Sequence, residues 1–188
     1  MPDEEFLLLG DALWLDFVNT AEYPPLGHDC LGDPGDYLRW TKAARIEPPR
    51  DAVAFEEALA LRGRLLALAR ALDVGRNPPP SAIEAINRLM VGMDGREQLV
   101  RVGGNWQLRF RAVRTPSALE AIAQSAAQTL ATPVAVIRRC ANPACGLYFA
   151  DESPTQSRRW CSRSRCGQSG KIERRRNTPR PTPMITEG

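Results

Sequence analysis

Apolar residues recur at helical spacing in five parts of the chain, which polar or proline-rich segments separate. The predicted helices cover residues 11–22, 36–45, 52–74, 81–90 and 118–130. The first is so densely apolar from Leu13 to Val18 that a buried strand is an alternative, although the spacing favours a helix. The third is expected to turn one set of apolar side chains toward the core, namely Phe55, Leu59, Leu66 and Leu72.

Residue types that are common at helix N-termini occur at the start of four of these helices, and they predict where each helix begins. The expected caps are Asp33 with Pro34 after it, Asp51, and Ser81 in a capping box with Glu84, and the last helix is expected to open with Pro116 and Ser117.

Two other stretches have the pattern of strands. Apolar and polar residues alternate from Gln98 to Val113 around a glycine-rich turn, which predicts a β-hairpin with one face half buried. A short strand at residues 134–137 and an apolar strand at residues 147–149 are expected to form a smaller hairpin later in the chain.

Four of the five cysteines lie in two equally spaced pairs, C-x4-C, fifteen residues and C-x4-C again: Cys140, Cys145, Cys161 and Cys166. Two close pairs joined by such a loop can supply the corners of a tetrahedral Zn²⁺ site. Two disulfides and four unconnected thiols are the alternatives. Four thiolates would close the coordination shell, so the zinc would be structural and not catalytic.

The second cysteine pair also limits the local conformation. Side chains five residues apart on an α-helix point about 140° from each other, so both cannot reach one metal from a regular helix. We therefore expect Cys161 before a helix, Ser162 as its N-cap, and Cys166 in its first turn. That helix would continue toward Arg176, after which a proline-rich tail is expected to be extended.

The charge of the chain is unevenly distributed. The formal net charge is +3, but eleven Lys and Arg against three Asp and Glu lie between residues 138 and 180. A basic segment beside an acidic body is typical of a nucleic-acid-binding protein, with a solvated basic face as the alternative. The candidate contacts cluster around the proposed metal: Arg158, Arg159, Arg163, Arg165, Lys171, Arg174, Arg175 and Arg176.

Together these patterns predict an α+β protein. Residues 1–135 would form a mainly helical domain with a small β-hairpin, residues 136–177 a zinc-finger module, and residues 178–188 a flexible tail. No apolar run is long enough to span a membrane, and acidic residues stand where a secretory signal would be basic. A soluble cytoplasmic protein is expected.

Two motifs resemble one known family. LWLDFVNT, at residues 13–20, resembles the opening signature of the ABATE domain, which forms the N-terminal part of stress-induced transcription regulators. The cysteine segment resembles the CGNR zinc finger that follows this domain, through Arg139, Cys140, Cys145, Gly146, Phe149, Asp151, Ser153, Arg158, Arg159, Trp160, Cys161, Ser162, Cys166, Gly167, Lys171 and Arg176. The name-giving motif departs from the pattern, because it reads Cys166-Gly167-Gln168-Ser169. The resemblance implies transcription regulation under stress, and an N-terminal domain that senses a small molecule or mediates homodimerisation.

The sequence therefore predicts a DNA-binding transcriptional regulator that is not an enzyme, with RNA left open as the nucleic acid. The rival hypotheses are an enzyme or small-molecule sensor with its site at Asp16 and Asn19, which His28 would join in the enzyme, and a protein-interaction module. Buried structural roles for Asp16 and Asn19 are the alternative to a pocket. His28 and Cys30 have no neighbours in sequence that would complete a metal or catalytic site.

Overall fold

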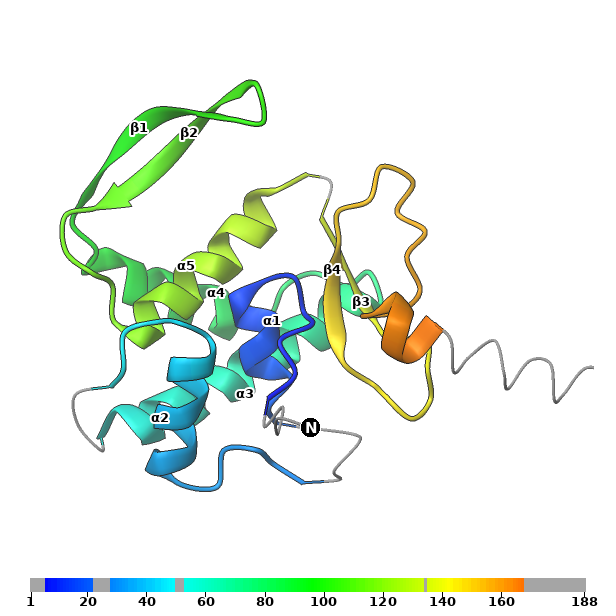
Figure 1. Ribbon diagram of the computed structural model, residues 1–188. Coiled ribbons are helices and arrows are strands. Elements are labelled where there is room, and N and C mark those ends of the chain that lie inside the picture. Colours follow the sequence, from blue (N-terminus) through cyan, green and yellow to red (C-terminus); the bar gives the residue numbers. More distant parts are fainter. Residues whose placement is uncertain (1–5, 22–27, 50–52, 134, 168–188) are drawn as a thin grey trace, which may run out of the picture.

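The computed structural model describes residues 6–21, 28–49, 53–133 and 135–167 (Figure 1). Its helices are α1 (Leu13–Val18), α2 (Pro34–Ala43), α3 (Val53–Asp73), α4 (Pro80–Val91) and α5 (Ala118–Ala131). Two antiparallel hairpins, β1 (Gly95–Val102) with β2 (Asn105–Ala112) and β3 (Val136–Arg139) with β4 (Tyr148–Asp151), precede a final turn, η1 (Arg163–Gly167). The predicted α+β fold is thus confirmed. No described helix has the length and hydropathy to cross a membrane.

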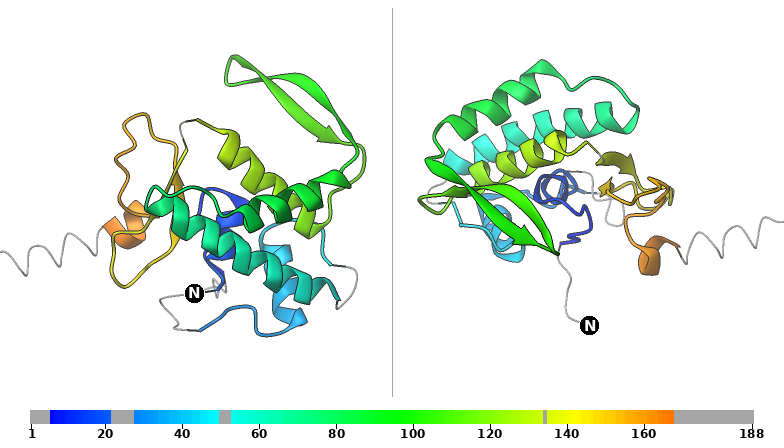
Figure 2. Two further views of the ribbon diagram at one scale, coloured as in Figure 1. Left: turned by 180° about the vertical axis from the view of Figure 1, so that it is seen from behind. Right: turned by 90° about the horizontal axis from the view of Figure 1, so that it is seen from above.

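The helices share one core, and α1 lies at its centre. This short helix packs against both α3 and α5 (Figures 1 and 2). Trp14 and Phe17 of α1 are fully buried, and Phe17 contacts Trp40 of α2 with ring centroids 4.9 Å apart. The first apolar segment is therefore a helix, as its spacing favoured, because its tryptophan and phenylalanine project into the gap between longer helices.

The buried stripe of α3 differs from the one expected. Leu61, Leu65 and Leu68 are the leucines that it buries, whereas Leu59, Leu66 and Leu72 are only partly buried. Phe55 is buried as predicted. The helix is apolar over much of its circumference, so spacing alone could not determine which side faces the core.

Three of the predicted helix starts can be compared with the structure. Asp33 caps α2 in a reciprocal capping box with Asp36, and Ser117 caps α5 in the same way with Glu120. The predicted Ser81–Glu84 box is wrong, because α4 begins at Pro80 with no side-chain cap. Proline suits the first helical position because its missing N–H would have no partner there. Asp51 lies outside the described residues.

The first hairpin is present, but the half-buried face expected for it is absent. β1 and β2 pair in register from Gly95–Ala112 to Val102–Asn105, and Gly103 and Gly104 form the turn with positive φ values of 55° and 89°. Both faces are largely open to solvent (Figure 1). None of the hairpin's apolar side chains belongs to a buried cluster within the described part of the chain.

The second hairpin joins the helical body to the cysteine module. Its first strand starts at Val136, two residues later than predicted. In β4, Tyr148 and Ala150 are buried with the helices, while Phe149, like Leu147 before it, packs with the four cysteines. Successive side chains of a strand point to opposite faces, so one face of β4 packs against the helices and the other against the cysteines.

Candidate metal centre

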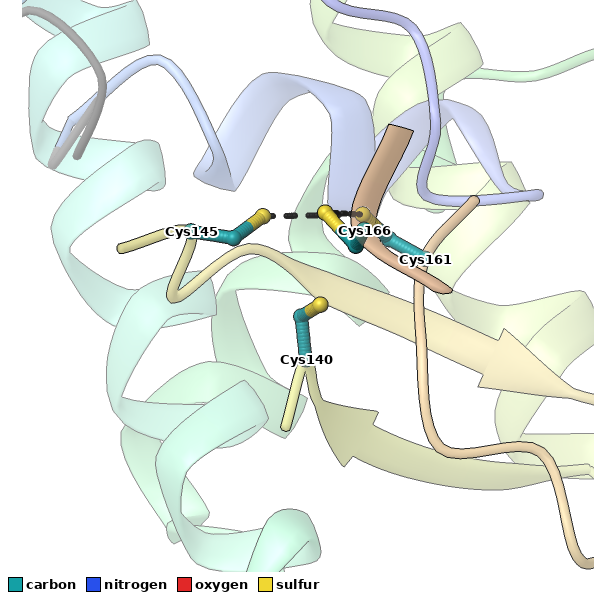
Figure 3. Close-up of side chains that lie close together, drawn as sticks. All are labelled: Cys140, Cys145, Cys161 and Cys166. Carbon is teal, nitrogen blue, oxygen red and sulfur yellow. Dashed lines mark hydrogen bonds between the residues drawn. The ribbon is translucent and has the colours of Figure 1, made fainter. Parts of the chain in front are cut away.

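The four paired cysteines converge on one point, although one pair lies between β3 and β4 and the other at the final turn (Figure 3). All four Sγ atoms lie within 4.8 Å of one another. The Sγ of Cys161 lies 3.6 Å from that of Cys145 and 3.7 Å from that of Cys166. Tetrahedral Zn–S bonds of about 2.3 Å place the sulfurs about 3.8 Å apart, whereas a disulfide requires about 2.05 Å. The cluster therefore fits a structural Zn(Cys)₄ site.

The local backbone explains how two pairs spaced C-x4-C can meet. Cys140 follows β3, and Gly146 after the second cysteine has a φ of 65°, which only glycine adopts freely. At the other pair, the Ser162 carbonyl accepts hydrogen bonds from the N–H groups of both Cys166 and Gly167. This five-residue π turn brings Cys166 back toward Cys161, which stands before it as predicted.

The Ser162 side chain acts as the predicted cap, since its Oγ accepts a hydrogen bond from the Arg165 N–H at 3.3 Å. The continuation toward Arg176, together with Gln168 and Ser169, lies outside the described residues.

The protonation of the thiols shows why this cluster needs a cation. Hydrogen bonding from the Cys161 thiol lowers the pKa of Cys145 to about 5, which makes it the first thiolate. The hydrogen bond to Cys145 and then burial raise the pKa of Cys161, while burial raises the pKa of Cys166 to about 11. Four buried thiolates would repel one another, so a bound dication is required to deprotonate them together.

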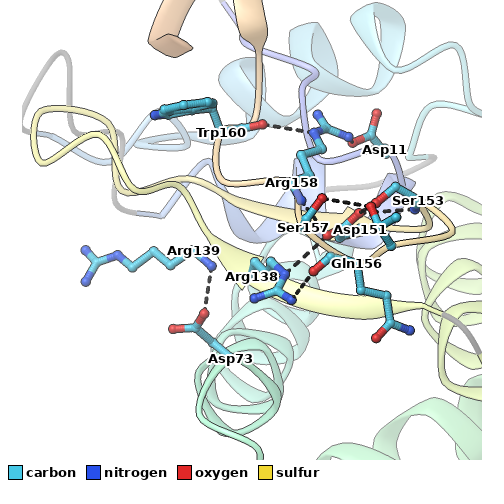
Figure 4. Close-up of polar contacts among 11 residues, drawn as sticks. Asp11, Asp73, Arg138, Arg139, Asp151, Ser153, Gln156, Ser157, Arg158 and Trp160 are labelled. Atoms are coloured by element: carbon cyan, nitrogen blue, oxygen red, sulfur yellow. Dashed lines mark hydrogen bonds and ion pairs between the residues drawn. The ribbon is translucent and has the colours of Figure 1, made fainter. Parts of the chain in front are cut away.

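Asp151 organises the segment between the cysteine pairs (Figure 4). Its buried carboxylate accepts hydrogen bonds from the backbone N–H groups of Ser153 and Arg158 at 3.1 and 3.0 Å, and from the Ser153 hydroxyl at 2.6 Å. Arg138 adds an ion pair at 3.3 Å. Burial acts to raise the pKa of Asp151, but these hydrogen bonds outweigh it and lower the pKa. A permanent carboxylate thus shapes the loop that leads to Cys161.

The guanidinium of Arg158 forms hydrogen bonds within the protein (Figure 4). Its Nη1 donates to the Asp11 carboxylate at 2.5 Å, its Nε donates to the Trp160 carbonyl at 2.9 Å, and its Nη2 donates to the Cys161 carbonyl. The guanidinium also lies 4.6 Å from the ring centroid of Phe149. These contacts give Arg158 a positioning role, because they attach the second cysteine pair to the N-terminal segment.

The other predicted basic contacts fall into two groups. Arg159, Arg163 and Arg165 are exposed on the segment that contains Cys161 and Cys166, and the Arg159 guanidinium lies 5.5 Å from the Trp160 ring centroid. Trp160 itself is partly buried against the cysteine cluster, as expected of a residue in the small core. The second group lies outside the described residues, namely Lys171, Arg174, Arg175 and Arg176.

Asp16 and Asn19 both bond the backbone of other segments. The Asn19 amide is buried and pairs with the Tyr148 backbone in both directions, with N···O distances of 2.9 and 2.8 Å. Asp16 accepts the Gly10 N–H at 2.7 Å, and burial raises the pKa of Asp16 to about 6. Asn19 thus acts as an extra hydrogen-bonding partner along the edge of β4.

His28 and Cys30 complete no second metal site in the described part of the chain, where the four paired cysteines form the one cluster able to hold an ion. Cys30 packs on the apolar side of that cluster.

A cavity of about 610 Å³ lies elsewhere in the helical body, and the sequence did not reveal it. Its wall includes Tyr37, Glu47, Glu57, Arg114 and Glu120. Tyr37 is fully buried, and its hydroxyl has no hydrogen-bond partner among the described residues. Burial raises the pKa of Tyr37, so the phenol stays protonated. The residues come from separate elements, and a buried tyrosine gives no sequence signal that its hydroxyl lacks a partner.

A helical body that carries a closed four-cysteine site on a shared hairpin defines a zinc-finger protein. Residues 11–133 match the ABATE family model, described as "Putative stress-induced transcription regulator", and residues 137–178 match the CGNR zinc finger. The chain therefore belongs to the ABATE family. Neither description names an enzymatic activity. A comparison with curated proteins finds no match.

Proposed function

We propose that the protein is a cytoplasmic DNA-binding transcription regulator, linked to stress, in which the zinc site presents arginines to the phosphate backbone. One observation carries the proposal: Arg159, Arg163 and Arg165 are exposed on the short segment that Cys161 and Cys166 anchor. A loop and turn held by a metal lose less conformational entropy when they bind than a mobile basic tail would. Lys171 and Arg174 to Arg176 add four basic residues to the sequence that follows this segment.

The contacts of Arg158 exclude it from the residues proposed to contact phosphate. Because its guanidinium already bonds Asp11 and two carbonyls, Arg158 supports the DNA-binding segment and leaves the phosphate contacts to its neighbours. A loss of DNA binding on changing Arg158 would therefore not identify a DNA contact.

The proposal is tested by titrating duplex DNA into the zinc-loaded protein. Replacing Arg159, Arg163 and Arg165 together by Ala should weaken binding about 100-fold, at about 1 kcal/mol for each lost phosphate contact. The matched control replaces three exposed arginines of the helical body, Arg64, Arg76 and Arg88, by Ala, and should bind as the wild type does. Equal losses in both triple variants would overturn the proposal. The same titration with duplex RNA determines which nucleic acid is preferred.

A small-molecule effector site is a second candidate function, and the cavity at Tyr37 supports it. Ligand cavities of this size are common, and charged side chains line this one. Three carboxylates against one arginine line the wall, so the preferred ligand would be a small organic cation.

Titration calorimetry with a series of small amines and their neutral alcohol analogues tests this candidate. Amines should bind the wild type more tightly than the alcohols, and Glu57→Gln should weaken amine binding about threefold, because it removes one of the lining carboxylates. Equal binding of amines and alcohols, or an unchanged affinity in Glu57→Gln, would exclude this cavity as the site.

A further inference from the structure

The β1–β2 hairpin has one apolar face that no other part of the described chain covers. Residues opposite each other in an antiparallel pair share a face, so Leu99 and Leu108 lie together at its middle. Trp106 lies on the tip side of this pair and Phe110 on the base side. Leu99, Trp106 and Leu108 are 62%, 65% and 62% exposed.

An exposed apolar face is unusual for a two-stranded hairpin. A two-stranded hairpin is marginally stable alone in water and normally packs its apolar face on a helix or another sheet. Here the Phe110 ring covers Gly95, where an added Cβ would lie 2.1 Å from Cζ, and this contact stiffens only the base of the hairpin. The rest of the face is available to a partner.

The charges on the same face indicate which partner fits. In the strand register Glu97 lies opposite Phe110, and Arg101 lies opposite Trp106. One charged residue therefore lies on each side of the leucine pair. Glu97 and Arg101 are four residues apart on one extended strand, about 13 Å, which is too far for them to pair with each other.

A two-fold axis could give each of these charges an opposite charge in a second copy. The axis would run across the strands, parallel to the sheet, over the leucine pair. Two hairpins packed face to face about this axis place Glu97 of each copy opposite Arg101 of the other, with leucine on leucine between them. The bases of the two hairpins then lie at opposite ends, so the helical bodies are kept apart. We propose that this hairpin face is the homodimer interface of the protein.

The size of the face sets the expected strength of the dimer. Eight residues per strand give a face of about 27 Å by about 10 Å, so two copies bury less than the roughly 1,200 Å² of stable interfaces. The dimer should therefore be reversible, with a dissociation constant in the micromolar range. Dimerisation would also present two zinc modules at once, but the proposed interface does not depend on DNA binding.

Sedimentation velocity of the zinc-loaded full chain, between about 1 µM and about 200 µM, tests the interface. Wild-type protein should shift from monomer to dimer as concentration rises. Glu97→Arg and Arg101→Glu should each weaken association at least about tenfold, because each places like charges opposite one another. An equimolar mixture of the two variants should restore association, since the two positive side chains of one variant would then face the two negative side chains of the other.

Arg111→Glu is the matched control, because it makes the same charge change on the opposite face of the hairpin and should leave the dimer unchanged. A wild type that stays monomeric at every concentration would overturn the proposal. So would a mixture of the two variants that fails to associate. If Trp106→Ala weakens duplex-DNA binding while the wild type remains monomeric, the face belongs to nucleic acid and the proposal is wrong.

Discussion

Two neighbouring arginines illustrate how differently identical residues act beside the zinc site. Arg158 bonds Asp11 and two backbone carbonyls, whereas Arg159 is exposed beside Trp160. The sequence RRW shows two basic residues and places both near the metal, but it does not show that Asp11, far away in the chain, bonds one of them. The zinc ligands were predictable because their spacing is local, while the role of Arg158 depends on a contact between distant segments.

Arg158→Ala should lower the free energy of unfolding by about 2 kcal/mol, because the variant loses two hydrogen bonds to carbonyls and a contact with Phe149. Arg159→Ala should change it by less than about 0.5 kcal/mol. Urea denaturation of both zinc-loaded variants measures the difference. Equal stabilities would contradict the positioning role.

Asn19 provides a second residue-scale prediction. Asn19→Asp replaces the amide that donates to the Tyr148 carbonyl with a buried carboxyl group, and should lower the free energy of unfolding by about 2–3 kcal/mol. Chemical denaturation at neutral pH measures this loss. The exposed Asn87→Asp, on α4, is the control and should be nearly neutral. If Asn19→Asp unfolds like the wild type, the amide does not hold β4.

Glu120 gives a pH-dependent prediction. The hydrogen bond from Arg114 lowers the pKa of Glu120 to about 2, below its ordinary value of 4.5. Because its pKa is lower in the folded than in the unfolded chain, ionised Glu120 stabilises the fold at pH values above the pKa of the unfolded chain. This contribution is lost as pH falls toward 2. Glu120→Gln should therefore cost about 1–2 kcal/mol at pH 7, and the cost should shrink below pH 4.5.

The comparison is made at each pH between the two proteins, so that loss of zinc in acid affects both alike. A cost that stays constant down to pH 2.5 would contradict the ion pair with Arg114, since glutamine keeps the capping geometry at Ser117.

At the scale of elements, the sequence predicted the existence of helices and hairpins better than their surroundings. Alternation identified β1 and β2 correctly, but an alternating strand shows only that one face is apolar, not what covers it. Similarly, α3 is apolar on too many sides for its buried stripe to be chosen from spacing. The cap at Asp33 was predictable from its own residue type and the proline after it, but its reciprocal partner Asp36 was not predicted, and the one capping box that was predicted, at Ser81, is absent.

β4 is the element that connects the two matched family regions. Tyr148 bonds Asn19 of the N-terminal region, the Ala150 N–H donates to the Gly10 carbonyl at 2.9 Å, and Phe149 packs with the cysteines. β4 therefore packs with residues on both sides of the boundary predicted between residues 135 and 136.

At the scale of the whole molecule, zinc should stabilise the helical body as well as the module. Removing zinc with a chelator, or blocking its binding with Cys145→Ser, should increase amide hydrogen exchange in α1 as well as around the cysteines. The reason is that β4 carries side chains into both clusters. Exchange that increases only in residues 140–167 would contradict this coupling, and zinc retained by Cys145→Ser would contradict the ligand assignment.

The central claim is that the zinc module holds arginines for phosphate contacts, and the salt dependence of DNA binding tests it most directly. A plot of the logarithm of the binding constant against the logarithm of salt concentration should have a clearly negative slope for the zinc-loaded wild type. The slope should become shallower by about 2.7 when Arg159, Arg163 and Arg165 are replaced by Ala, and should not change for Arg64, Arg76 and Arg88. A flat wild-type slope, or the same change in both triple variants, would contradict the account.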